Sequence, residues 1–295
     1  MTLLILNWLA GAVGWFWLIR RYDRIDPEPY RAMLSVGILG GLVSGLVALE
    51  IMSLFESTVL GMTEGWMTAV ENETATTGEL IILALETGLI EEFSKALATI
   101  YFAKRLGEVD EPIDAVLYAM LVGLGFAVIE NLEYAIEFGI GTLLWRNIFC
   151  IPGHVGYALR WGCGLAQARF AKPGTPVLAV IAPTLLIAAL LHAGYDYVAI
   201  TASGGAITLY AVIQTIALLW FAHTRLKVLG RESPHLAVGE CSACRAKNPP
   251  GSQYCSACGE SLAQDFFNFC AECSHRIPIH ARYCPNCGTS ISKII

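Results

Sequence analysis

Long apolar runs, separated by short polar stretches, recur along the chain as far as about Ala222. About 20 residues of helix, rising 1.5 Å per residue, cross the roughly 30 Å hydrocarbon core of a membrane. The apolar runs reach or exceed this length. The pattern therefore predicts an all-α polytopic membrane protein with about seven transmembrane helices. The predicted spans are 2–19, 34–55, 77–103, 113–138, 143–170, 176–201 and 205–222.

The composition agrees with this pattern. Of the 295 residues, 55% are hydrophobic and 15% are charged, whereas soluble domains average about 25% charged residues. The net charge of −6 is modest and does not itself bear on nucleic acid. The chain has no basic stripe, which argues against nucleic acid as a partner. The lipid bilayer is the partner that the composition predicts.

Positive charges are distributed unevenly between the connections of the predicted spans. Lys and Arg follow the first, third, fifth and seventh spans, whereas the connection 56–76 contains glutamates but no Lys or Arg. Because connections rich in Lys and Arg remain in the cytosol, we predict an N-terminus outside and a cytosolic C-terminus.

Four of the predicted spans contain ionisable residues within apolar sequence. Such a residue costs roughly 2.5–3.5 kcal/mol on insertion scales, so its retention indicates a function. The residues are Glu91, Glu92, Lys95, Glu130, His154, His192 and Asp196. Carboxylates and imidazoles are the groups that activate water in hydrolytic enzymes. We therefore predict an intramembrane hydrolase.

Helical spacing groups some of these residues. Glu91 and Lys95 are four apart, so they lie on one helix face and can pair, whereas Glu92 points about 100° away, towards a neighbouring helix. His192 and Asp196 also share a face. A carboxylate one turn from an imidazole can select its tautomer and raise its basicity.

Four residues on four predicted spans have similar depths. Counted from the outer ends at 1.5 Å per residue, Glu91, Glu130, His154 and His192 lie roughly 12–21 Å deep. This layer in the outer half of the membrane predicts one shared site. The alternatives are a structural ion pair for Glu91 and Lys95, and a buried histidine with satisfied hydrogen bonds for His154.

Eight of the ten cysteines lie after residue 240, in four C-x-x-C pairs, and the second half repeats the spacing of the first. Four thiolates bind one zinc ion tetrahedrally, and crowded C-x-x-C pairs favour zinc over disulfides. We predict two structural zinc ions in a double zinc ribbon at 241–295, joined by a polar linker at 226–240 to a membrane domain at 1–225. The predicted ligands are Cys241, Cys244, Cys255 and Cys258 for one ion and Cys270, Cys273, Cys284 and Cys287 for the other.

At the intramembrane residues, the chain resembles the PrsW family of intramembrane proteases over about residues 1–225. The shared motifs, in order, are E-E-x-x-K from Glu91, F-x-x-x-E-N from Phe126, a histidine in the next helix at His154, and H-x-x-x-D from His192. The resemblance implies an endopeptidase of a prokaryotic plasma membrane. Its substrate would be a membrane-anchored protein, typically an anti-sigma factor, cut at its outer side.

The resemblance also implies roles for individual residues. It makes Glu91, Glu92 and His192 the strongest catalytic candidates. The other catalytic candidates are Glu130, His154 and Asp196, and the supporting residues are Lys95, Phe126 and Asn131. The related CAAX prenyl endopeptidases use a glutamate and histidines to activate water. A catalytic zinc and a metal-free glutamate mechanism both remain open, and either Glu91 or Glu92 can be the base.

Three other functions compete with this interpretation. A CAAX-type protease that processes prenylated proteins or peptides is the alternative among enzymes. A non-enzymatic membrane scaffold of the same superfamily has no need of both glutamates and both histidines. A transporter could use the same carboxylates, but the spans show no clear inverted repeat. The zinc ribbons are expected to dock a cytosolic protein partner or to form a structural cap without one.

Overall fold

The computed structural model describes residues 2–58, 75–107, 109–170, 176–233, 240–248, 252, 254–262, 267–270, 272–273, 276–278, 283–284 and 286–290. Each predicted span coincides with a helical segment. In chain order, the elements are α1 (Thr2–Arg20), α2 (Tyr30–Thr58), α4 (Thr77–Leu106), α5 (Pro112–Phe138), α6 (Thr142–Trp145), η1 (Arg146–Cys150), α7 (Ile151–Arg169), α8 (Val177–Thr201), α9 (Gly205–Arg231), β1 (Phe267–Phe269) and β2 (Arg276–Pro278).

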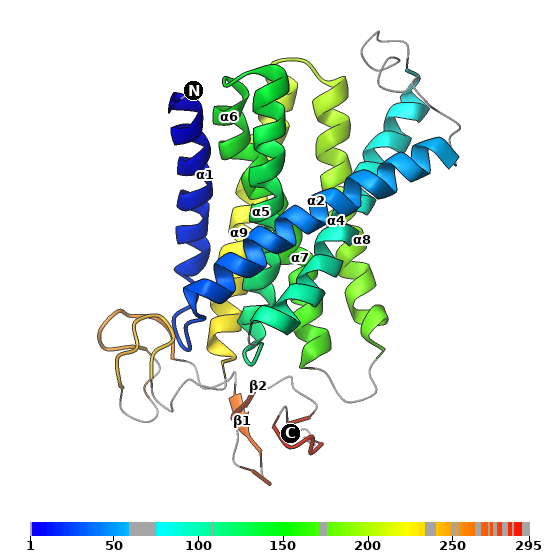
Figure 1. The fold of residues 1–295 in the computed structure, drawn as a ribbon. Coiled ribbons are helices and arrows are strands. Elements are labelled where there is room, and N and C mark those ends of the chain that lie inside the picture. The colour runs from blue at the N-terminus through cyan, green and yellow to red at the C-terminus, as the bar shows by residue number, and fades with distance from the viewer. Residues whose placement is uncertain are drawn as a thin grey trace.

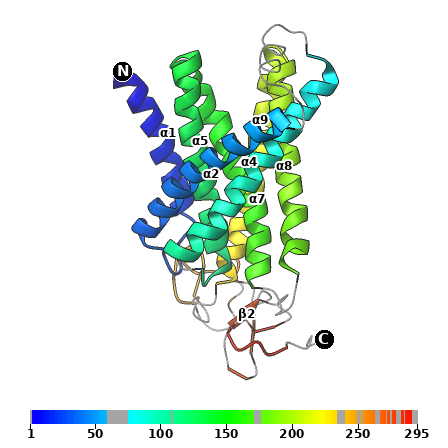
Figure 2. The same ribbon diagram turned by 45° about the vertical axis from the view of Figure 1, so that its right-hand side comes forward.

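The helices form a bundle around α5 (Figure 1). In its most apolar stretch, 83% of α5 is buried, against 11% for α9. Helix α5 packs on α7 and α2, while α4 packs on α2 and α8. Helix α2 runs obliquely across α4 and α5, as both views show (Figure 2). Helix α5 is therefore the central element against which the others are positioned.

In the part of the chain that the structure describes, four helices are long and apolar enough to cross a membrane: α2 over Tyr30–Phe55, α5, α8 and α9. Helix α1 adds a shorter apolar segment, Ile5–Arg20. Large apolar side chains such as Leu46, Ile213 and Trp220 face outwards, as expected of helices surrounded by lipid. The all-α membrane class is thus confirmed for the bundle, and crossing by all seven segments stays a prediction.

Side-chain caps define the starts of the two helices that carry most of the glutamates. At the start of α4, Thr76 and Glu79 form a reciprocal capping box, with Thr76 N donating to Glu79 Oε2 at 2.7 Å. At the start of α5, Glu111 N donates to Asp114 Oδ2 at 2.7 Å, and Pro112 occupies the first turn, where its missing N–H costs nothing. These caps fix the residue at which each helix begins. The start of the helix in turn determines which residues lie on each of its faces.

The predicted span 143–170 is helical throughout but changes type within it. Residues Arg146–Cys150 form a π-helix, in which Ile151 N donates to the carbonyl of Arg146 five residues earlier. Such wide turns are frequent at functional sites. Here the extra residue per turn changes the direction of Arg146 relative to the side chains of α7.

Glycines bring α2 and α5 into backbone contact. A Cβ on Gly125 would lie 2.0 Å from the carbonyl oxygen of Gly37, and one on Gly41 would lie 2.4 Å from the carbonyl carbon of Gly125. A side chain at either position would force the helices apart. This close approach fixes α5 immediately before Phe126, the first residue of its site motif.

The linker boundary requires one correction. Helix α9 continues through Arg231, so residues 226–231 are helical and do not belong to the polar linker predicted for 226–240. The physical reason is burial, because Leu226 and Leu229 belong to the hydrophobic core of the bundle.

The cysteine-rich segment lies at the end of the bundle where α1 stops (Figures 1 and 2). Its two short strands pair antiparallel, with Asn268 opposite Ile277. Arg245 Nη1 donates to the carbonyl of Ile25 at 2.7 Å, and Glu260 forms ion pairs with Lys227 and Arg231 of α9. The segment is therefore docked on the bundle by polar contacts.

We expect Gly41→Ala to lower the unfolding temperature, because its methyl group would collide with the backbone of α5. Overpacking of this kind typically costs about 1–3 kcal/mol. The matched control is Gly45→Ala, whose Cβ would meet only Phe126, at 3.9 Å. Thermal unfolding of both variants in detergent checks this, and equal unfolding temperatures would show that the α2–α5 contact is not tight.

Candidate active site

Helices α4, α5, α7 and α8 bring all nine predicted intramembrane residues into one buried region. The residues are Glu91, Glu92, Lys95, Phe126, Glu130, Asn131, His154, His192 and Asp196. Residues 100 positions apart in the chain are thereby in direct contact, as for His192 and Glu92. The arrangement agrees with the expectation of one shared site.

Lys95 lies at the meeting point of three helices and is fully buried. Its ammonium group donates to Glu91 Oε2 at 3.1 Å, to Glu92 Oε1 at 2.8 Å and to His154 Nδ1 at 2.9 Å. An ammonium group has three hydrogens to donate, and these contacts use them. The ring of Phe126 covers the cation at 3.9 Å from Nζ to the ring centroid. The ion pair weighed for Glu91 and Lys95 therefore exists as part of a larger network.

Glu92 is the most fully bound carboxylate of the site, with no exposed surface. Its Oε1 accepts from Lys95 and from His192 Nδ1 at 3.1 Å, and its Oε2 accepts from Trp161 Nε1 at 2.9 Å. Donors from α4, α7 and α8 thus hold this carboxylate in one orientation. We interpret Glu92 as the residue that positions the other groups.

His192 presents its second nitrogen to two further carboxylates. Because Nδ1 donates to Glu92, Nε2 carries the lone pair of the neutral ring. Nε2 lies 3.5 Å from Asp196 Oδ2 and 3.8 Å from Glu91 Oε2. Both distances are too long for direct hydrogen bonds. Asp196 Oδ2 is buried without a hydrogen-bond partner among the described residues, so this space suits a water molecule or a cation.

The contacts of His154 define its protonation. Its Nδ1 accepts from Lys95, so Nε2 carries the hydrogen of the neutral ring, and Nε2 lies 2.8 Å from Glu130 Oε2. The ring also meets that of His192 edge to face, at 5.0 Å between centroids. The alternative of a histidine with satisfied hydrogen bonds is consistent with this geometry, but its partners are ionisable groups of the site.

Sequence reasoning missed Arg146, which neutralises Glu130. Arg146 Nη2 lies 2.8 Å from Glu130 Oε2, and Nε donates to Asn131 Oδ1 at 2.7 Å. Its guanidinium group also covers the ring of Tyr134 at 3.7 Å. One arginine thus contacts both polar residues of the F-x-x-x-E-N motif. The sequence did contain a signal for Arg146, because it is a lone arginine within an apolar run. Its contact with Glu130 was not visible in the sequence, since it depends on the π-helical turn.

A cavity of about 260 Å³ adjoins these groups. Its polar lining comes from Glu130, Arg146, His154, His192 and Asp196. The remaining wall is largely aromatic, contributed by Tyr134, Trp145, Phe149, Tyr157 and Tyr195. A cavity with apolar walls and a few convergent ionisable groups is typical of a substrate site.

The membrane site contains a set of groups that fits a metal ion. Glu91, His154 and His192 each offer one ligand atom, and these atoms lie within 4.8 Å of one another. Two histidines and one carboxylate are an established ligand set for catalytic zinc.

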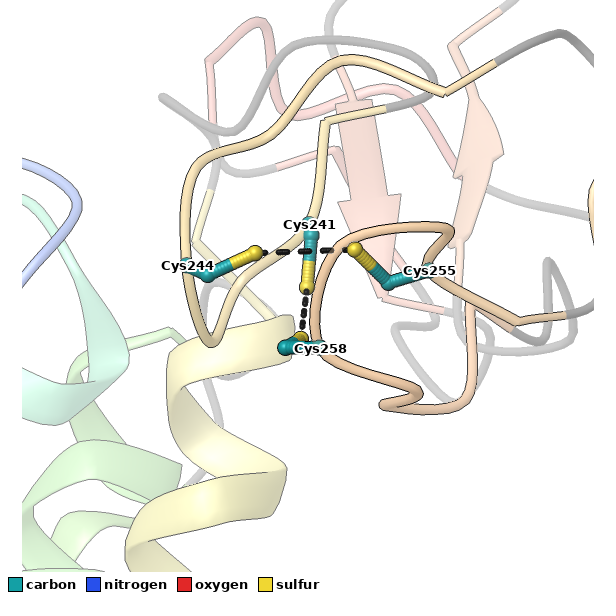
Figure 3. A group of neighbouring side chains, drawn as sticks. All are labelled: Cys241, Cys244, Cys255 and Cys258. Atoms are coloured by element: carbon teal, nitrogen blue, oxygen red, sulfur yellow. Dashed lines mark hydrogen bonds between the residues drawn. The ribbon is translucent and has the colours of Figure 1, made fainter.

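The two cysteine groups have the geometry of structural zinc sites. In the first group, Cys241 Sγ lies 3.6 Å from Cys258 Sγ, and Cys244 Sγ lies 3.5 Å from Cys255 Sγ (Figure 3). The corresponding distances in the second group are 3.4 and 3.5 Å. Zn–S bonds of about 2.3 Å place tetrahedral sulfurs about 3.8 Å apart. Both groups therefore fit one zinc ion each.

Comparisons with known proteins also divide the chain into a membrane part and a cysteine-rich part. Residues 28–221 match the family described as PrsW family intramembrane metalloprotease, and residues 241–288 match the double zinc ribbon. Protease PrsW of Shouchella clausii is 33% identical over 133 residues, which are 45% of this chain and 60% of that protein. Protease PrsW of Clostridioides difficile is 28% identical over 229 residues, or 75% of this chain and 87% of that protein.

A third relative, protease PrsW of Bacillus subtilis, is 26% identical over 199 residues, which are 68% of this chain and 82% of that protein. No solved structure matches the chain significantly. The fold and the site together define a helical membrane protein with a buried glutamate–histidine centre suited to hydrolysis. The chain belongs to the PrsW family of intramembrane proteases and carries a double zinc ribbon at its C-terminal end.

Replacing one cysteine of a ribbon should remove one zinc ion per chain. We expect Cys255→Ser and Cys284→Ser each to lower the bound zinc by about one ion, because three thiolates hold zinc far less tightly than four. Metal analysis of the purified protein measures this. Cys163→Ala, which removes a buried thiol of α7, is the control and should keep the wild-type content. Unchanged zinc in both ribbon variants would contradict the assignment.

Proposed function

We propose that this protein is an endopeptidase that cuts a membrane-anchored protein, such as an anti-sigma factor, within the outer half of the membrane. The observation that carries the proposal is the contact of Glu91 and Glu92 with His192, which itself lines the cavity of about 260 Å³. Membership of a protease family supports hydrolysis as the reaction.

Glu91 is the better candidate for the base. Glu92 is enclosed by donors on both oxygens, whereas Glu91 Oε2 lies 3.8 Å from His192 Nε2, so that one water molecule placed beside both atoms can bridge them. In this mechanism, Glu91 accepts a proton from that water as it attacks the scissile carbonyl carbon. His192, held by its hydrogen bond to Glu92, orients the water, and the protonated Glu91 then donates its proton to the leaving amine.

Arg146 is placed to stabilise the oxyanion. Its guanidinium group borders the cavity, and its contacts with Glu130 and Asn131 use some of its five N–H donors. The others can bind negative charge that develops on the scissile carbonyl oxygen. Glu130 and Asn131 thus act as positioning residues for the arginine.

If the family's metal is present, Glu91, His154 and His192 would hold it, and it would supply a polarised carbonyl and an acidified water. Glu91 would then act as a ligand, which leaves Glu92 as the remaining glutamate for proton transfer. Lys95 now donates to His154 Nδ1. Because a lone pair serves only one partner, the ammonium group would have to leave that nitrogen if the metal bound there.

We propose an orientation in the plasma membrane with the N-terminus outside and the zinc ribbons in the cytosol. Basic residues concentrate at the ribbon end of the bundle, including Arg20, Arg21, Lys104, Arg105, Arg169, Lys227 and Arg231. Such residues remain in the cytosol. All seven helical segments would then cross the membrane, and a cytosolic protein would dock on the ribbons.

We expect Glu91→Gln to lower the cleavage rate by about 10²–10⁴-fold, because the amide can neither accept the proton nor carry charge. The assay uses a fluorogenic membrane-anchored peptide with the full-length protein in lipid nanodiscs. Glu133→Gln, at an exposed position of α5, is the matched control and should retain the wild-type rate. Wild-type cleavage by Glu91→Gln would remove this residue from the mechanism. A wild-type protein that cleaves no membrane-anchored substrate would favour the scaffold.

The metal requirement can be tested by counting zinc. If zinc binds in the membrane site, the wild-type protein should contain about three zinc ions per chain, two of them in the ribbons, whereas the mechanism with Glu91 as the base gives about two. His192→Ala should retain about two and lose activity, since it removes a ligand and leaves the cysteines untouched. Metal analysis and the cleavage assay on the same preparations measure both effects. An active wild-type protein with only two zinc ions would establish the metal-free mechanism.

A further inference from the structure

A second group of buried carboxylates lies at the ribbon end of the bundle. Asp23 follows α1, Glu28 precedes α2, and Glu111 and Asp114 stand at the start of α5. Their exposed fractions are 4%, 5%, 1% and 0%. At 1.5 Å per residue along α5, Asp114 lies about 24 Å from Glu130. This acidic cluster is therefore separate from the active site.

The carboxylates of the cluster converge. One oxygen each from Asp23, Glu111 and Asp114 lies within 4.8 Å of the other two. A second set, formed by Glu28, Asp110 and Asp114, has the same property and shares Asp114. Unscreened negative charges at this separation repel strongly in a buried environment. A positive charge between them would remove the repulsion.

Two oxygen atoms of the cluster point to a ligand. Asp23 Oδ1 and Asp114 Oδ1 are buried without a hydrogen-bond partner among the described residues. The other oxygen of each carboxylate is anchored. Asp23 Oδ2 accepts from the backbone N–H of Glu28 at 2.8 Å, and Asp114 Oδ2 accepts from that of Glu111 at 2.7 Å. The anchoring holds the two unpartnered oxygens in place, at a cost that a bound cation would offset.

The surrounding hydrogen bonds join the cluster to three segments of the chain. Tyr118 of α5 donates to Glu28 Oε2 at 2.5 Å, and Arg20 at the end of α1 pairs with Asp23 at 3.1 Å. Ser233, just after α9, donates to Glu111 Oε1. Ser233 begins the connection that leads to the zinc ribbons, so the cluster lies where the tail leaves the bundle.

We propose that Asp23, Glu111 and Asp114 bind a divalent cation of the Ca²⁺ or Mg²⁺ type at this position. The donors are carboxylate oxygens, which suit these hard cations, whereas zinc prefers nitrogen and sulfur ligands. The cation joins the α1–α2 connection to the start of α5. Through the hydrogen bond of Ser233 to Glu111, it also stabilises the attachment of the tail.

Protons are the rival means of neutralising the cluster. Burial and the neighbouring carboxylates, first Asp110 and then Asp23, raise the pKa of Glu111 to about 8. A protonated cluster would bind no cation at neutral pH. The two explanations therefore predict different results when Ca²⁺ or Mg²⁺ is added near neutral pH. A cation site gives saturable binding, and a protonated cluster gives none.

The test is calorimetric titration of the full-length protein in detergent at pH 7.5 with CaCl₂ and, separately, with MgCl₂. The buffer contains no chelator, so the ribbons retain zinc, and NaCl keeps the ionic strength constant. We expect saturable binding of about one ion per chain with a micromolar to millimolar dissociation constant. A rise of several degrees in unfolding temperature should accompany saturation. No saturable binding up to about 10 mM of either ion would overturn the proposal.

Two variants locate the site. Asp114→Asn removes a shared carboxylate and should weaken cation binding at least tenfold. Asp26→Asn changes an exposed carboxylate of the same α1–α2 connection and should change the affinity less than threefold. Equal effects of the two variants would place the ion elsewhere and overturn the assignment. If Asp114→Asn fails to fold, Glu111→Gln takes its place with the same expectation.

Discussion

The buried ammonium group of Lys95 is the interaction on which the active site depends. It donates to two glutamates of its own helix and to His154 of α7, and each of these partners contacts a further helix. A cation at this position allows two adjacent carboxylates to remain charged in an apolar bundle, where they would otherwise repel. Removing it would leave uncompensated charge, so the same residue maintains both packing and the ionisation of the site.

A second constraint positions the partners of this network. The glycine contact brings the backbones of α2 and α5 together and so sets the distance between these helices. Phe126 and Glu130, on that helix, then meet Lys95 and His154. The geometry of the site therefore derives from backbone contact outside it, together with the caps that set where α4 and α5 begin.

Long apolar runs were sufficient to predict the helices, and charge within these runs identified residues that the structure brings together. Both signals can be read from the sequence, because they depend only on neighbouring residues or on the distance of a residue from the end of its span. The roles of Arg146 and Trp161 were not predictable, because each acts on a residue of another helix through packing that no spacing reveals. The end of α9 was missed for a related reason, since burial of Leu226 and Leu229 extends a helix whose sequence has already become polar.

The π-helical turn at Arg146–Cys150 has a consequence for how this segment tolerates length changes. A regular α-helix absorbs the loss of one residue only by rotating everything beyond it through about 100°. Loss of one residue from the wide turn would convert it to an ordinary one and leave α7 in place, but it would swing the guanidinium group away from Glu130. The segment would thus keep its helical fold but lose the positive charge that neutralises Glu130. A deletion here would therefore damage the site without unfolding the protein.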